Sequence, residues 1–213
     1  MLSMSSLNLH ATPFYPRSES DLTLITMNCR SLVNKLAELS IVLESTKPSI
    51  VCLTETWLCP SVSVHVPGYS CFRRDRPAHE NRNAHSFTRG YGGVAVLVRT
   101  DAFQHILHRP DLQRQGCEST WVEVKSQCTP NPILVCCMYR PPSQTAEQLS
   151  FFSDMLVDAI QSSCYDECDF FLTGDFNAKH NDWCSSDSTS TAGTNLQTVF
   201  SMLGLQQLVS FPT

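Results

Sequence analysis

Phe170 to Asn177 read F-F-L-T-G-D-F-N, and this stretch decides how the rest of the chain is interpreted. An apolar run typical of a β-strand ends at Gly174, and Asp175 and Asn177 follow with one residue between them. Alternate residues of a strand point the same way, so we expect a carboxylate and a carboxamide side by side on the rim of a sheet. Such a pair is suited to holding and activating a water molecule.

Three other apolar runs end in polar side chains that suit the same site. Asn28, Glu55 and Tyr139 each close a run of this kind. Taken singly, a polar residue after a strand is most often a turn former, and a tyrosine there can simply cap the core. Strand ends that share one edge of a sheet form a cleft, however, so the four positions together predict a functional site.

The pattern of apolar runs and turn residues predicts an α+β fold in layers. Helices are expected at Lys35–Thr46, Ala146–Ser162 and Thr194–Leu203, the first of them between two strands as in a βαβ unit. Strands are expected at Leu22–Met27, Ile50–Leu53, Tyr69–Arg73, Gly92–Val98, Thr120–Lys125, Ile133–Tyr139, Asp169–Thr173 and Gln207–Val209.

Bulk composition limits the class of protein. The 213 residues favour one domain from Asp21 to Thr213, preceded by a loose polar tail at Met1–Ser20. The formal net charge is −5, so any contact with nucleic acid must be local or helped by a bound cation. No signal peptide or membrane span is predicted, and the odd count of 11 cysteines favours reduced thiols in an intracellular compartment.

Five motifs together resemble a known superfamily. They are N-C-R-S-L-x-N-K from Asn28, L-T-E-T-W-L from Leu53, Y-G-G-V-A-V-L-V from Tyr91, M-Y-R-P-P from Met138 and L-T-G-D-F-N from Leu172. In this order they resemble the endonuclease/exonuclease/phosphatase superfamily. The resemblance is greatest to the apurinic-endonuclease-like domain of non-LTR (LINE-type) retrotransposons of the jockey and CR-one kind, and it extends from Leu22 to the end of the chain.

The resemblance implies a fold and a reaction. The implied fold is the DNase-I-like four-layer α/β sandwich, in which two mixed β-sheets pack face to face with helices outside. The implied reaction is phosphodiester hydrolysis with Mg²⁺ or Mn²⁺. In a LINE-type domain it nicks target DNA and exposes the 3′-hydroxyl that primes reverse transcription. The implied partners are DNA and a reverse transcriptase domain in a parent polyprotein, and a functional protein would work in the nucleus.

The resemblance also implies a role for each strand-end residue. Glu55 resembles the metal-binding glutamate, and Asn28 the asparagine that supports metal and phosphate. Tyr139 resembles the tyrosine that hydrogen-bonds the scissile phosphate. Asp175 resembles the aspartate that orients and deprotonates water, and Asn177 the residue beside it that positions the water or a phosphate oxygen. One glutamate with an asparagine is an adequate start for Mg²⁺, which prefers oxygen ligands and retains several waters.

One family motif is missing, because no Asp-His dipeptide of an S-D-H motif occurs in the chain. We therefore expect a C-terminally truncated domain that lacks its last strands and nicks DNA weakly or not at all by itself. Two alternatives to an active DNA endonuclease stay open: a catalytically silent remnant that at most binds metal or nucleic acid, and a phosphatase of the same superfamily.

Two further patterns carry weaker predictions. The basic segment that contains Arg73, Arg74, Arg76 and Arg89 is interpreted either as a loop that contacts DNA phosphates or as a solvated insertion. A zinc-like pattern consists of Cys164, Cys168, His180 and Cys184. Its spacing matches no common zinc finger, so free thiols are expected instead.

Overall fold

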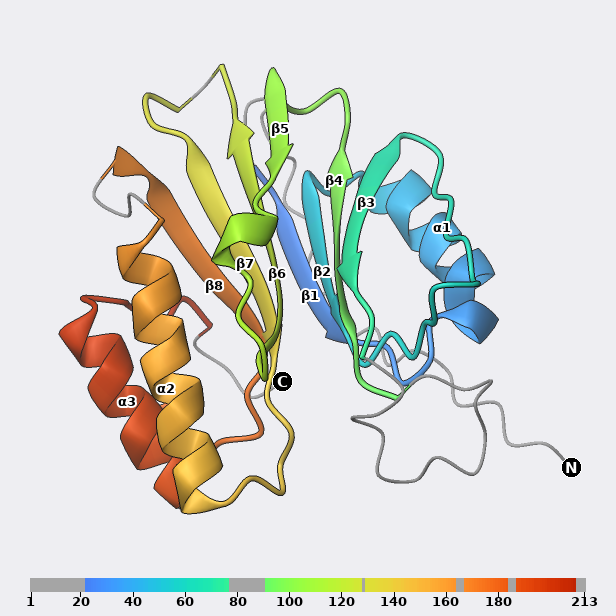
Figure 1. The fold of residues 1–213 in the computed structure, drawn as a ribbon. Helices are drawn as coiled ribbons and strands as arrows, with labels where there is room; N and C mark the ends of the chain where they lie inside the picture. The colour runs from blue at the N-terminus through green and yellow to red at the C-terminus, as the bar shows by residue number, and fades with distance from the viewer. Residues whose placement is uncertain (1–21, 77–90, 128, 164–166, 184–186, 210–213) are drawn as a thin grey trace, which may run out of the picture.

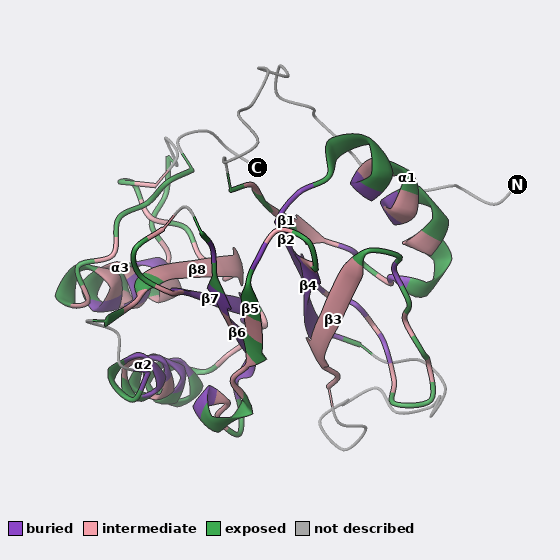
Figure 2. Cartoon of the chain, turned by 90° about the horizontal axis from the view of Figure 1, so that it is seen from above, coloured by how far each residue is buried: buried purple, intermediate pink, exposed green. Residues whose placement is uncertain are grey.

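Two facing β-sheets with helices on their outer sides form the molecule (Figure 1). This computed structural model describes residues 22–76, 91–127, 129–163, 167–183 and 187–209. Helix α1 covers one sheet, and α2 and α3 cover the other, which gives four layers (Figure 2). The predicted DNase-I-like four-layer sandwich is therefore confirmed.

The first sheet has the strand order β1-β2-β4-β3. Its members are β1 (Leu24–Asn28), β2 (Ile50–Thr54), β3 (Tyr69–Arg74) and β4 (Val94–Arg99). Strands β1 and β2 run parallel and are joined through a 3-10 turn at Val33–Lys35 and helix α1 (Leu36–Thr46), as the predicted βαβ unit requires. The other pairings in this sheet are antiparallel.

The second sheet has the order β5-β6-β7-β8. It contains β5 (His105–His108), β6 (Glu118–Lys125), β7 (Ile133–Tyr139) and β8 (Asp169–Asp175), with a 3-10 turn at Pro110–Leu112. Strands β7 and β8 are parallel and are connected through α2 (Ala146–Gln161), and α3 (Thr191–Met202) follows β8. Each sheet thus contains one parallel pair whose carboxyl ends lie at the lower end of Figure 1.

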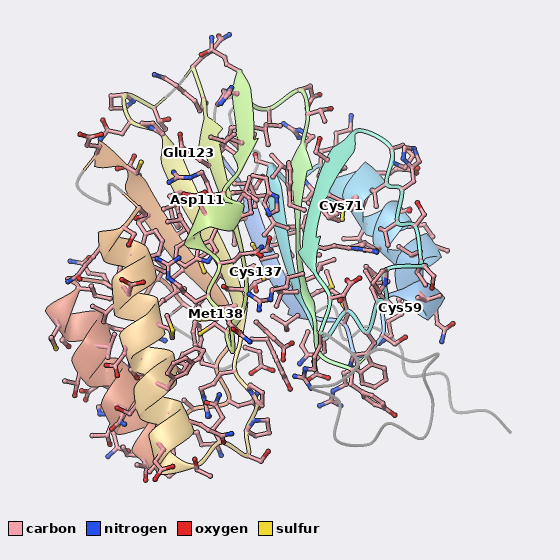
Figure 3. The ribbon with its side chains drawn as sticks, viewed as in Figure 1. Cys59, Cys71, Asp111, Glu123, Cys137 and Met138 are labelled. Atoms are coloured by element: carbon pink, nitrogen blue, oxygen red, sulfur yellow. The ribbon has the colours of Figure 1, made fainter. Side chains whose placement is uncertain are left out.

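Alternation along the strands separates three apolar clusters. Val94, Val96 and Val98 pack between the sheets, whereas Ala95 and Leu97 pack in the cluster under α1. Strand β7 does the same on the other side, where Cys137 joins the inter-sheet cluster and Met138 the cluster under α2 and α3 (Figure 3). Strands buried on both faces explain why β2, β4 and β7 read as continuous apolar runs.

The helices over the second sheet begin at side-chain caps. Thr145 accepts a hydrogen bond from the backbone N–H of Gln148, whose side chain accepts one from the N–H of Thr145, and this capping box fixes the start of α2. Ser190 caps α3, which therefore begins three residues before the predicted Thr194. Full burial of an apolar side chain such as Phe152 or Leu156 under these helices stabilises the fold by about 1.5–3 kcal/mol.

One strand was missed by the sequence analysis, and one predicted strand is wrong. His105–His108 forms the edge strand β5, which the sequence did not reveal because only alternate residues of this short H-I-L-H run are partly buried. The predicted strand at Gln207–Val209 is not formed, and this segment lies exposed after α3. The predicted tail at Met1–Ser20 lies outside the described residues.

Two sequence-based expectations concern the whole chain. In the part of the chain that the structure describes, no helix has the length and hydropathy needed to cross a membrane. Among the described cysteines, those that are free thiols include Cys29, Cys52, Cys59, Cys71, Cys117, Cys136 and Cys137.

Candidate active site

Polar residues from both sheets meet at the carboxyl ends of the parallel strands. The side-chain amide of Asn28, at the end of β1, donates to Oε1 of Glu55 at 2.8 Å and to Oδ2 of Asp175 at 2.9 Å. Glu55 follows β2 and Asp175 ends β8, so one amide joins carboxylates of two different sheets. The three residues, separated by up to 147 positions in sequence, are thus brought together as the sequence predicted.

The backbone around Glu55 is held in an unusual conformation. Glu55 and Trp57 have φ angles of +51° and +52°, values that L-residues adopt rarely. Their segment is held by backbone bonds, since Thr56 N–H donates to Gly93 O at 3.2 Å and Trp57 N–H to Gly92 O at 2.9 Å. Local backbone strain of this kind is typical of functional sites and persists because the surrounding hydrogen bonds fix it.

Asp175 and Asn177 are associated by a turn and not by strand alternation. Strand β8 ends at Asp175, and Asn177 has a left-handed φ of +45°. The backbone N–H of Asn177 donates to Oδ1 of Asp175 at 3.1 Å, while its side-chain amide donates to the carbonyl of Arg140 at 2.9 Å. Asp175 and Asn177 are therefore close, as predicted. The predicted reason, alternation along one strand, was wrong because β8 ends at Asp175 and does not reach Asn177.

Arg140 holds this turn and was missed as a site residue. Its side chain is only 2% exposed, and its guanidinium donates to the carbonyls of Phe176 and Asn177, each at 2.5 Å. Burial lowers the pKa of Arg140, and the nearby charge of Asp175 opposes that change. The Y-R-P-P motif was the available signal, since an arginine directly after a buried strand needs partners.

Tyr139 ends β7 and lies almost buried beside the two carboxylates. Its exposed fraction is 8%, and burial, followed by the charge of Glu55, raises the pKa of its phenol to about 12. The group is therefore a neutral hydrogen-bond donor at physiological pH. The guanidinium carbon of Arg76 lies 5.7 Å from the centre of its ring.

The predicted DNA-binding arginines that the structure describes have partners within the chain. Arg73 donates to the carbonyls of Val62 and Cys59 and pairs with Asp75 at 3.3 Å. Arg74 donates to the carbonyl of Arg114 at 2.9 Å. Arg76 pairs with Glu118. Their contact with DNA remains a prediction, and Arg89 lies outside the described residues.

Comparison with known proteins assigns the family. The profile of the endonuclease/exonuclease/phosphatase family matches residues 25–200. The chain belongs to this family. It is also 24% identical, over 157 residues, to the RNA-directed DNA polymerase from mobile element jockey of Drosophila funebris. That match covers 74% of this chain but only 15% of the jockey protein.

Solved structures of this family share the fold. The endonuclease domain of TRAS1, a telomere-specific non-LTR retrotransposon, superposes with a TM-score of 0.67 at 18% identity, covering 91% of this chain and 76% of that domain. The AP endonuclease LMAP from Leishmania major gives a TM-score of 0.60 at 16% identity, over 89% and 71% of the two chains. The 3′ phosphatase NExo from Neisseria, bound to product DNA hairpin, gives 0.57 at 17% identity, over 85% and 71%.

The oxygen-rich cluster fits a hard divalent cation. Nucleases of this family generally depend on a divalent metal, and Mg²⁺ is commonly held by one or two carboxylates with water. Glu55 and Asp175 supply two carboxylates that share the amide of Asn28, so a cation there would offset their mutual repulsion.

The zinc-like pattern of the sequence forms no metal-binding cluster among the described residues. The described part of the chain contains no group of three or more histidine, cysteine or acidic side chains able to hold a metal. Within the zinc-like pattern, Cys168 is half-buried, and Nδ1 of His180 lies 3.5 Å from Oδ2 of Asp182. Cys164 and Cys184 lie outside the described residues.

Proposed function

We propose that this chain is a metal-dependent DNA endonuclease domain of a retrotransposon, which nicks target DNA to expose the 3′-hydroxyl that primes reverse transcription. The observation that carries the proposal is the Asn28 amide bound to Glu55 and Asp175 at 2.8 and 2.9 Å, because it gathers the site from two sheets. The similarity to the jockey polymerase and to the TRAS1 endonuclease domain supports the retrotransposon assignment. A reverse transcriptase domain is then the expected partner in the parent polyprotein, and the nucleus the expected site of action.

The residues of the site divide the reaction between them. Asp175 accepts a proton from the water that attacks phosphorus, and Asn28 and the N–H of Asn177 keep its two oxygens oriented. The neutral phenol of Tyr139 donates to a non-bridging phosphate oxygen. The bond from phosphorus to the 3′-oxygen breaks, and that oxygen takes up a proton from the solvent. One product then ends in a 3′-hydroxyl and the other in a 5′-phosphate.

Glu55, with the support of Asn28, would hold Mg²⁺ or Mn²⁺. When bound, the ion supplies positive charge that offsets the negative charge developing on the phosphate. The formal net charge of the chain is −5, which disfavours contact with a phosphodiester. The charge of the bound cation would allow that contact without an extended basic surface.

Plasmid relaxation tests this proposal. Supercoiled DNA is incubated with the purified chain and Mg²⁺, beside an EDTA control, Asp175→Ala and the matched surface variant Asp182→Ala. We expect slow nicking that needs the cation, is lost in Asp175→Ala and is retained in Asp182→Ala. Equal cleavage by wild type and Asp175→Ala would remove the role given to Asp175.

A second substrate separates the alternatives. A duplex ending in a 3′-phosphate tests for phosphatase activity. This alternative is tested because the fold is similar to that of the 3′ phosphatase NExo. Release of phosphate without any nicking would favour the phosphatase. Binding of DNA or metal without either reaction would favour a silent remnant.

A further inference from the structure

Four segments meet around the guanidinium of Arg76, close to the proposed site. Arg76 follows β3, Gly92 and Gly93 precede β4, Glu118 begins β6 and Tyr139 ends β7. Nε of Arg76 donates to Oε1 of Glu118 at 2.5 Å, and Nη2 of the same guanidinium pairs with that carboxylate. The other oxygen of Glu118 accepts the backbone N–H of Gly93 at 2.6 Å, which ties the pair to the first sheet.

The guanidinium of Arg76 lies over the ring of Tyr139. The distance of 5.7 Å from its central carbon to the ring centre is within the range of a cation–π contact. Gly92 makes room for it, since a Cβ at that position would lie 2.5 Å from the guanidinium atoms. Arginine suits this place better than lysine, because a planar fork can bind a carboxylate at its edge and stack on a ring with its face.

The Arg76–Glu118 ion pair differs from an ordinary surface ion pair because it is largely buried. The side chains of Arg76 and Glu118 are 17% and 8% exposed. A largely buried ion pair is no more stabilising than apolar residues of similar size, so its presence beside Tyr139 calls for another explanation. Orientation of the phenol supplies one.

We propose that Arg76 is a positioning residue for Tyr139: Glu118 fixes its guanidinium, and the guanidinium fixes the direction in which the phenol meets the scissile phosphate. The inference rests on the proposed function, because it gives Tyr139 its role on the phosphate. It differs from the DNA-backbone contact predicted for Arg76, since the arginine then acts through the tyrosine. The charge of Arg76 also lowers the pKa of Tyr139, against the larger effect of burial.

A spectroscopic test does not depend on activity. The chain is labelled with ring-¹³C tyrosine, and the Tyr139 signal is assigned by its loss in Tyr139→Phe. We expect Arg76→Met and Glu118→Gln to shift that signal, Arg76→Lys to shift it less than Arg76→Met, and Arg99→Met to leave it in place. Arg99 is a matched control because it pairs with Asp101 at the opposite end of β4. An unmoved Tyr139 signal in folded Arg76→Met overturns the proposal; if that variant does not fold, an unmoved signal in folded Glu118→Gln does so.

Binding and kinetics separate positioning from a phosphate contact. Loss of one phosphate contact reduces the slope of log affinity against log salt by about 1. We expect Arg76→Met to leave this slope unchanged and to lower kcat by about 10²-fold, as for a misplaced reacting group. In a Tyr139→Phe background the same substitution is expected to have little further effect. A reduced salt slope, or an undiminished loss of kcat in that background, overturns the proposal. If the wild-type chain does not nick DNA, the proposed function fails. The ring signal of Tyr139 and the salt dependence of DNA binding still decide the role of Arg76.

Discussion

At the scale of single residues, the carboxamide of Asn28 contacts three other residues of the site region. Its nitrogen donates to two carboxylates that would otherwise repel each other, and its oxygen accepts the backbone N–H of Arg30 at 3.2 Å. Aspartate at this position has nearly the same shape but no donor and one more negative charge. Comparing Asn28→Asp with Asn28→Ala therefore separates the effect of side-chain size from the effect of hydrogen bonding.

We expect Asn28→Ala to lower the free energy of unfolding by about 1–3 kcal/mol, because hydrogen bonds to charged groups contribute on this scale. Asn28→Asp should lower it further without a metal, since it brings a third carboxylate to the cluster. Urea denaturation measures both, with Asn181→Ala as a surface control. The bridging role would be wrong if both variants were as stable as that control.

The phenol of Tyr139 predicts a pH dependence of stability at high pH. Burial raises its pKa from the ordinary 10 to about 12, so the folded protein keeps a proton that the unfolded chain loses. The stability linked to this group is complete below pH 10 and is lost as the pH rises toward about 12.

Tyr139→Phe removes that titration. Thermal unfolding between pH 9 and pH 12 should therefore show a steeper loss of stability in the wild type than in Tyr139→Phe. Tyr91→Phe, which removes a phenol that is 41% exposed, serves as the control. Parallel curves for wild type and Tyr139→Phe would contradict a buried neutral phenol.

At the scale of elements, the close approach of β7 and β8 depends on Gly174. Its φ is +142°, and a Cβ there would lie 1.8 Å from the carbonyl oxygen of Met138. Gly174→Ala must push the two strands apart one residue before Asp175. We expect a loss of about 1–3 kcal/mol in the free energy of unfolding, as for other overpacked sites.

The displaced strand end should also reduce nicking more than the loss of stability explains. Gly204→Ala is the matched control, because its φ is +66° but nothing lies within 4 Å of the added carbon. In urea denaturation Gly204→Ala should lose only the stability that a left-handed φ costs an L-residue, about 1–2 kcal/mol, whereas nicking measured by plasmid relaxation should fall only in Gly174→Ala. Similar behaviour of the two variants would refute a special demand for close packing at Gly174.

The elements that the sequence predicted well are those whose burial is continuous or strictly periodic. Strands β2, β4 and β7 are buried on both faces, and α2 has a capping box, so each leaves a clear local signal. Strand β5 leaves none, because its backbone pairing with β6 sets its conformation and its side chains are half exposed. Tertiary pairing of this kind cannot be read from a four-residue run.

The candidate site divides in the same way. Asn28, Glu55, Tyr139 and Asp175 end apolar runs, so their shared edge could be predicted from strand order. The contacts that orient these residues could not be predicted from the sequence. Arg140 and the Arg76–Glu118 pair join residues that are far apart along the chain. Long-range side-chain contacts depend on how the two sheets pack.

At the scale of the whole molecule, the site lies where the two sheets join. Asn28 and Glu55 belong to the first sheet and Asp175 to the second, and the apolar cluster between the sheets fixes their separation. The folded protein therefore presents a paired carboxylate cluster that the unfolded chain lacks. A ligand that binds only the folded state adds stability in proportion to the logarithm of its concentration.

Mg²⁺ or Mn²⁺ should accordingly stabilise the chain against heat. At a free concentration ten times Kd the gain is about 1.4 kcal/mol, which for a domain of this size raises Tm by about 3–5 °C. Glu55→Gln should abolish the shift and Asp175→Asn should reduce it, because each removes one carboxylate from the junction between the sheets. Glu147→Gln, in the first turn of α2, should keep the full shift. Melting curves recorded with and without the metal test this, and a shift of equal size in Glu55→Gln would mean that the cation binds elsewhere.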